Sequence, residues 1–268
     1  MSFSIAGKTA VVTVAANGVG LAIGRHFLQM GANVVFVDMD EKALCHEMGE
    51  DAGKEENVRI FSGDLRKKLT IANLLSTTID AFERVDILVN ASRQVMTTDP
   101  LDPDDNSVEE LLQQNTLTAM RVSQAVARKM IKQAEADPTD GPIGSIVNLS
   151  SIAARRTHPD LLAYSVSSAA LDQMTRSMAV ALAPHGIRVN AVAFGSVMSA
   201  SLKGSLKDQD ETRTAIVNNT PLSRIASPGE VSDAVQYLAS DASAFVTGQI
   251  ITVDGGRTLL DPADVSAH

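Results

Sequence analysis

Short apolar segments rich in β-branched residues alternate with stretches of helical spacing along the whole chain. Strands are expected at residues 9–14, 33–37, 58–61, 85–89, 143–149, 187–192 and 249–253. Helices are expected between them, at 21–30, 41–52, 69–82, 108–133, 161–182 and 230–239. Short apolar strands separated by helices predict an α/β fold, in which helices cover both faces of a doubly wound parallel sheet of about seven strands. We therefore expect a single Rossmann-type domain over residues 1–268.

Charge and composition narrow the classes of partner. The net charge is −9, and the basic residues are scattered, which argues against a nucleic-acid surface or an anionic membrane and favours a small-molecule ligand. The single cysteine, Cys45, excludes an internal disulfide and is typical of the cytoplasm. Residues 1–7 lack the pattern of a signal peptide, and no apolar run reaches the roughly 20 residues that span a bilayer. Because the five histidines show no metal-ligand spacing, we expect no metal site.

Two segments interrupt the alternation of strands and helices. The polar stretch 134–141 is interpreted as a surface insertion. The stretch 196–220 is too long for an ordinary connection and follows the sixth expected strand, at the sheet edge where such folds bind ligands. We expect this second segment to be a substrate lid.

The first turn and the end of the second strand carry a dinucleotide pattern. Gly18 and Gly20 lie in the turn before the first expected helix, where glycines let the backbone approach a pyrophosphate near helix amides. Alone this pattern is weak, since an ordinary strand-to-helix turn gives it too. Asp38 ends the second strand, where a carboxylate accepts the adenosine ribose hydroxyls and repels a 2′-phosphate, so NAD is favoured over NADP. Asp38 is alternatively an exposed carboxylate near a helix start.

Taken in order, several stretches resemble the short-chain dehydrogenase/reductase family, and 3-oxoacyl carrier-protein reductases in particular. They cover nearly the whole chain and are residues 13–20, 86–93, 144–151, 164–168, 188–195, 227–230, 247–249 and 254–256. Six positions depart from the family pattern, and Ala91 and Ser92 in the strand-four signature are two of them. Val14 and Arg93 replace glycines, Phe194 stands where proline is usual, and Ser168 replaces the lysine of Tyr-x-x-x-Lys. The Val14 substitution is tolerable if that residue has a negative φ.

The resemblance implies roles for particular residues. Ser151 and Tyr164 would be catalytic, and Asn115 would hold a relay water. The implied cofactor contacts are Thr13, Ala16, Asn17, Gly18, Val19, Gly20, Asp38, Asp64, Leu65, Asn90, Ala91, Tyr164, Ser168, Gly195, Val197 and Ser199. For Asp64, beside Leu65, an N-cap is an equally good interpretation. Homotetramers or homodimers are implied by the C-terminal pattern.

Loss of the lysine makes turnover the open question. A free phenol has a pKa of about 10, so Tyr164 needs a nearby positive charge to exchange protons near pH 7. One hypothesis is that oxidised nicotinamide supplies the positive charge and that a water chain from Asn115 past Ser168 fills the space of the missing ammonium group. It predicts that Ser168→Lys raises turnover sharply. Arg93 is a second candidate cation, and the alternatives are that it neutralises the pyrophosphate or blocks the pocket.

Two functions follow. The first is an NAD-linked oxidoreductase that interconverts a secondary alcohol and a ketone. The second is a catalytically silent relative that binds a cofactor or metabolite, or serves as a partner subunit. Arg155, Arg156 and His158, which follow Ser151, are candidate substrate contacts, and ordinary solvated side chains are the alternative.

Overall fold

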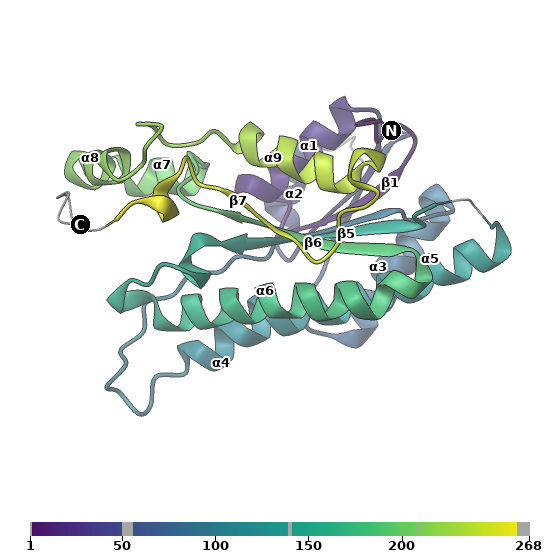
Figure 1. Cartoon of the computed structure of the whole chain (residues 1–268). Coiled ribbons are helices and arrows are strands. Elements are labelled where there is room, and N and C mark those ends of the chain that lie inside the picture. Colours follow the sequence, from purple (N-terminus) through teal and green to yellow (C-terminus); the bar gives the residue numbers. More distant parts are fainter. Residues whose placement is uncertain (1, 50–55, 139–140, 208, 262–268) are drawn as a thin grey trace.

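The protein is a single parallel sheet covered by helices on both faces (Figure 1). The computed structural model describes residues 2–49, 56–138, 141–207 and 209–261. The 7-stranded sheet has the order β3-β2-β1-β4-β5-β6-β7, and each neighbouring pair is parallel. Its strands are β1 Thr9–Thr13, β2 Asn33–Asp38, β3 Val58–Ser62, β4 Ile87–Asn90, β5 Gly144–Ser151, β6 Ile187–Phe194 and β7 Ile250–Val253. The predicted fold class is thereby confirmed.

The order of the strands also marks where a ligand would bind. From β1 the chain proceeds outward through β2 to β3 and then returns to place β4 on the other side of β1. In open α/β sheets such a reversal leaves a crevice at the carboxyl ends of the central strands. The loops after β1, β4 and β5 therefore meet at one edge.

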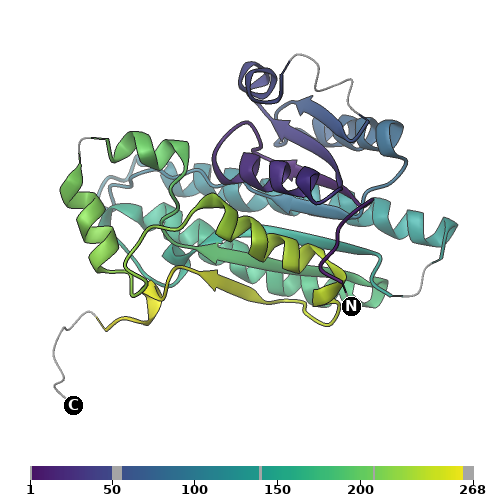
Figure 2. The same ribbon diagram turned by 90° about the horizontal axis from the view of Figure 1, so that it is seen from above.

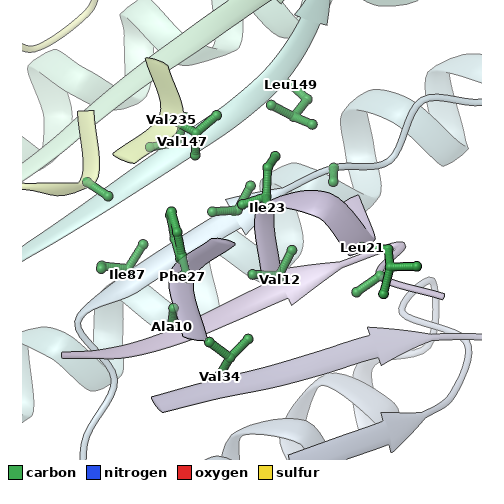
Figure 3. Packing of buried hydrophobic residues seen from close by; sticks show 14 of the residues in the cluster. Ala10, Val12, Leu21, Ile23, Phe27, Val34, Ile87, Val147, Leu149 and Val235 are labelled. Carbon is green, nitrogen blue, oxygen red and sulfur yellow. The ribbon is translucent and has the colours of Figure 1, made fainter. Parts of the chain in front are cut away.

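Alternating side chains of the strands form two cores. Ala10 and Val12 of β1 pack with Phe27 and Val235 on one face, as Figure 3 shows. Val11, between them, joins the core of the opposite face, because successive strand side chains point to opposite sides. The first core lies under α1 Gly18–Gln29, α2 Glu41–Met48 and α9 Pro228–Ala239. The second lies against α3 Lys68–Phe82, α5 Thr118–Ala136 and α6 Leu162–Leu182.

The expected helix 108–133 is present as a continuous helical segment, but it is not α-helical throughout. The chain forms α4 Ser107–Leu111, then a π turn over Leu112–Leu117, and then α5. A π turn inserts an extra residue and changes which side chains face the sheet beyond it. The other predicted elements are present with shifted ends. Residues 50–52 of the expected helix 41–52, and residues 139–140 of the expected loop, lie outside the described residues.

The expected lid segment contains two short helices, α7 Ala200–Ser205 and α8 Asp210–Asn218. Both lie beyond the carboxyl edge of the sheet, on the side of α9 (Figures 1 and 2). This position places the segment beside the crevice. In the described ranges no helix is both long and apolar enough to cross a bilayer.

Candidate active site

The turn between β1 and α1 leaves helix amides available to an anion. Asn17, the N-cap of α1, has an extended backbone and makes no side-chain capping hydrogen bond, and the first turn of the helix contains no acidic residue. A Cβ added to Gly18 would meet nothing within 4 Å, so the turn is open on that side. Unsatisfied amides at a helix N-terminus fit a phosphate group. The predicted pyrophosphate contact is therefore physically reasonable.

Val14 has a φ of 51°, so the negative φ that would make the substitution tolerable is not present. A β-branched residue is strained in the left-handed region. A Cβ at position 20 would lie 2.2 Å from the Val14 carbonyl oxygen, which explains why Gly20 is required. Thr13 holds the start of the turn in place, because its hydroxyl accepts a hydrogen bond from the Ala91 amide at 2.9 Å. This bond links the end of β1 to the loop after β4.

Asp38 lies at the end of β2 with its carboxylate turned toward the same turn. Its Oδ2 accepts from the Ala16 amide at 3.0 Å, and its Oδ1 accepts from the Met39 amide at 2.7 Å. A pocket of about 120 Å³ opens beside it, lined among others by Thr13, Val14, Asp64, Leu65 and Asn90. Its Oδ1 also accepts from the Asp40 amide at 3.2 Å, so about one of the four lone-pair sites of the carboxylate remains for a ribose hydroxyl. This acceptor and the pocket beside it fit the adenosine end of a dinucleotide.

Asp64 is paired with Arg66, a pocket residue that the sequence analysis did not identify. Arg66 donates from Nε and Nη2 to the two carboxylate oxygens, at 2.8 and 3.0 Å. The hydrogen-bonded guanidinium lowers the pKa of Asp64. The N-cap of α3 is Lys67, so the N-cap interpretation of Asp64 is wrong. The spacing Asp-x-Arg was the available signal for this pair.

Asn90 anchors the loop after β4. Its Nδ2 donates to Ser123 Oγ at 2.9 Å and to Asn148 Oδ1 at 2.8 Å, and Asn148 in turn donates to Thr175. These buried bonds tie the ends of β4 and β5 to α5 and α6. The next residues, from Ala91 onward, therefore leave the sheet from a fixed point.

Ser151 and Tyr164 meet at the carboxyl edge of the sheet. Ser151 ends β5, Tyr164 lies in the first turn of α6, and they are 2% and 3% exposed. Ser151 Oγ also accepts from the Ala153 amide at 3.1 Å. Between the two hydroxyls lies the Arg93 guanidinium, which donates from Nε to Tyr164 Oη and places Nη2 3.5 Å from Ser151 Oγ. The two predicted catalytic side chains are thus brought together, with a cation in contact.

Asn115 occupies the π turn and braces the chain beside Arg93. Its Oδ1 accepts from the Gln94 amide at 2.9 Å, and its Nδ2 donates to the Gln94 carbonyl at 2.9 Å. The second Nδ2 hydrogen points to Ser167 Oγ at 3.4 Å. Both amide hydrogens are therefore committed to protein groups. Ser168 is buried one helical turn after Tyr164.

The remaining predicted cofactor contacts lie after β6. Gly195 donates its amide to Val253 at 3.2 Å, Val197 forms a parallel bridge with Ala226, and Ser199 caps α7. The first of these contacts attaches the chain just before the 196–220 segment to β7. A hollow of about 620 Å³ lies nearby, bordered by Arg155, Ser196, Thr220, Leu222, Asp254 and Leu259.

The three candidate substrate contacts after Ser151 engage protein groups. Arg155 donates to Thr252 Oγ1 at 3.1 Å, and Arg156 donates to the Thr258 carbonyl. His158 caps the turn Pro159–Leu161, where its ring accepts from the Asp160 amide at 3.3 Å. Their structural roles are visible, and substrate contact remains a prediction.

The chain is similar in sequence to known proteins over most of its length. A family model described as enoyl-(acyl carrier protein) reductase matches residues 14–258. The chain is 31% identical to the oxidoreductase UcpA of Salmonella typhimurium over 97% of its own length and 98% of that protein. It is also 31% identical to the 3-oxoacyl-[acyl-carrier-protein] reductase FabG of Thermotoga maritima, over 94% and 98%.

Solved structures agree with these relatives. The crystal structure of gox2181 is 30% identical and superposes with a TM-score of 0.86 over 96% of this chain and 98% of that one. A 7α-hydroxysteroid dehydrogenase, solved with NADH and 7-oxoglycochenodeoxycholic acid, is 29% identical with a TM-score of 0.85, covering 95% of each chain. The chain belongs to the short-chain dehydrogenase/reductase family of oxidoreductase enzymes.

Proposed function

We propose that this enzyme interconverts a secondary alcohol and a ketone with NAD as the hydride carrier. The observation that carries the proposal is the pair of buried hydroxyls of Ser151 and Tyr164. They lie at the same edge of the sheet as the N-terminus of α1, whose amides are available to a pyrophosphate. Among relatives, the galactitol 2-dehydrogenase of Cereibacter sphaeroides is 30% identical over 96% of this chain. The activities named for this relative and for the hydroxysteroid dehydrogenase support an alcohol or ketone substrate class.

The chemistry assigns a task to each hydroxyl. A bound nicotinamide supplies or accepts the hydride at the carbon that bears the oxygen. Tyr164 takes the hydroxyl proton when an alcohol is oxidised and returns one when a ketone is reduced, so alcohol and NAD⁺ become ketone, NADH and a proton. Ser151 donates a hydrogen bond to the same oxygen and orients it. Their burial excludes water from the reacting oxygen.

Asp38 supports NAD over NADP. A 2′-phosphate beside its carboxylate would be repelled, whereas a ribose hydroxyl would be bound. We expect calorimetric titration to give tighter binding of NAD⁺ than of NADP⁺. In Asp38→Asn, NAD⁺ affinity should fall about ten- to hundredfold because a charged acceptor is lost. Asp233→Asn, which removes an exposed carboxylate on α9, serves as the matched control and should change neither affinity.

The same titration decides between the two functions. The silent alternative rests on one observation: the Arg93 guanidinium lies between the two hydroxyls, where a substrate oxygen would bind. Absence of NAD⁺ and NADH binding at millimolar concentration would refute the oxidoreductase proposal and leave a partner subunit or metabolite binder. Binding followed by reduction of NAD⁺ with secondary alcohols would support it.

We further propose that segment 196–220 closes over the substrate, that the chain assembles as a homodimer or homotetramer, and that it works in the cytoplasm. The position of α7 and α8 supports the first point, the C-terminal sequence pattern the second and the single cysteine the third. A monomer in light scattering would contradict the assembly.

A further inference from the structure

Two of the unusual residues in this chain are in direct contact. Arg93 leaves the loop after β4, and Phe194 is the last residue of β6. The guanidinium carbon of Arg93 lies 4.3 Å from the centre of the Phe194 ring, and Phe194 is 1% exposed. A cation over a buried aromatic face is attracted by the ring and restricted in orientation. Phe194 therefore acts as a platform that directs the guanidinium.

The N–H donors at the edge of the guanidinium reach the reacting groups. Its Nε donates to Tyr164 Oη, and its Nη2 approaches Ser151 Oγ. Arginine remains protonated at any working pH. A permanent positive charge is therefore held against the phenol that exchanges the proton.

The backbone around Arg93 is fixed on both sides. Ala91 before it donates to the Thr13 hydroxyl at 2.9 Å, and Ser92 donates to the Gln114 carbonyl at 3.1 Å. Gln94 after it makes two hydrogen bonds with Asn115. A cation held this way is oriented before any ligand arrives, which is the arrangement that stabilises developing negative charge.

Other charged groups in this region are directed elsewhere. Arg155 donates to Thr252, and Asp172 lies further along α6, beyond Ser168. The amide hydrogens of Asn115 are committed to Gln94 and Ser167. The geometry thus favours Arg93 over a route through Asn115.

We infer that Arg93 is a catalytic residue, which supplies the positive charge that favours the phenolate of Tyr164 and stabilises the reacting oxygen. The inference rests on the proposed alcohol–ketone chemistry for its consequence in turnover. The contact itself is testable without substrate or cofactor. A charge-assisted hydrogen bond is stronger than a neutral one, so removing the charge must shift the ionisation of the phenol.

Ultraviolet absorbance of tyrosinate gives the direct test. The chain has two tyrosines and no tryptophan, so Tyr237→Phe leaves Tyr164 as the only phenol. Absorbance is read within milliseconds of a pH jump, before alkaline unfolding, and Tyr164→Phe identifies the signal. In this background, Arg93→Gln should raise the pH of half-ionisation by about one unit or more, a tenfold change or greater. Arg93→Lys should shift it less, and Arg128→Gln, which removes an exposed charge on α5, should not shift it.

An Arg93→Gln curve that overlays the parent curve would overturn the inference. If Arg93→Gln does not fold by circular dichroism, Arg93→Lys and Arg93→Gly in the same background decide, because a curve unchanged by both has the same meaning.

Kinetic measurements distinguish a catalytic role of Arg93 from simple obstruction of the site by its side chain. Arg93→Gln should lower kcat about ten- to hundredfold with little change in the KM for NAD⁺. Ser168→Lys should restore turnover to Arg93→Gly. A higher kcat in Arg93→Gly alone would show that the guanidinium obstructs the site and would overturn the catalytic role. If the parent enzyme turns over no alcohol or ketone, the proposed function fails, while the absorbance titration still judges the contact.

Discussion

Strain at Val14 predicts which of two variants, Val14→Gly or Val14→Ala, has the larger free energy of unfolding. At an ordinary position glycine is less stable than alanine by roughly 0.5–1 kcal/mol, because the unfolded glycine chain has more freedom. At the Val14 φ of 51° a side chain instead costs roughly 1–2 kcal/mol. Alanine and glycine both lack the valine methyl groups, so their comparison removes most of the packing contribution. The backbone alone then decides the order.

We expect Val14→Gly to be more stable than Val14→Ala by about 0.5–1 kcal/mol. Urea unfolding at pH 7, followed by circular dichroism, measures this as a higher midpoint with an unchanged slope. Residue 12 on β1 supplies the control, since Val12 is buried in a regular strand and Val12→Gly should be less stable than Val12→Ala. If alanine is as stable as glycine at position 14, the strained backbone and the explanation of the turn are both wrong.

Three further substitutions test other parts of the fold by urea unfolding. Gly20→Ala should lose about 2–3 kcal/mol of stability, because its Cβ would lie 2.2 Å from the Val14 carbonyl oxygen, and a loss under about 0.5 kcal/mol would contradict this. Arg224 hydrogen-bonds Glu230 and lowers the pKa of that carboxyl from 4.5 to about 2. The wild type should therefore be more stable than Glu230→Gln above pH 4.5, and this difference should vanish as the pH falls toward 2. Burial raises the pKa of Asp172 above 3.8, so wild-type stability relative to Asp172→Asn should be greatest below pH 3.8 and fall as the pH rises; a constant difference would exclude charge as the cause.

The sheet could be predicted because each buried strand is a short apolar run. Val34, Val35 and Phe36 are all fully buried, as expected for a strand covered on both faces. Strand ends were less certain, since β6 continues to Phe194 and β5 to Ser151, where the chain already carries functional residues. The end of β5 is polar, Ser150 and Ser151, and so gave no hydrophobic signal, whereas the apolar Ala193 and Phe194 were an available signal for the end of β6.

The π turn and the lid helices had weaker signals. Across Leu112–Leu117 an α-helical pattern and a π turn share the same apolar positions, so spacing alone could not separate them. Helix α8 has no buried residue and therefore shows no apolar face in the sequence. Its formation depends on local preference rather than on a core.

The sequence was enough to identify the candidate site residues, but it could not predict which of them are in contact. Sequence analysis picked out Arg93 as an unusual residue but left three roles open for it. Its hydrogen-bond partner Tyr164 is 71 residues away in the chain, so only the fold brings the two together. The left-handed Val14 was missed because a residue type that disfavours positive φ gives no reason to expect it.

The contacts at Tyr164 distinguish compensation from simple loss of the lysine. A buried hydroxyl left without its usual partner normally costs stability and relaxes into another arrangement. Here Tyr164 and Ser151 are both buried, and one cation approaches both oxygens while resting on Phe194. If position 93 were glycine, as in the family pattern, this cation would be absent, so the role that we infer for Arg93 would supply the charge that Ser168 cannot provide. The site thus has an alternative source of charge at the phenol, which is why the loss of one lysine does not by itself imply a silent protein.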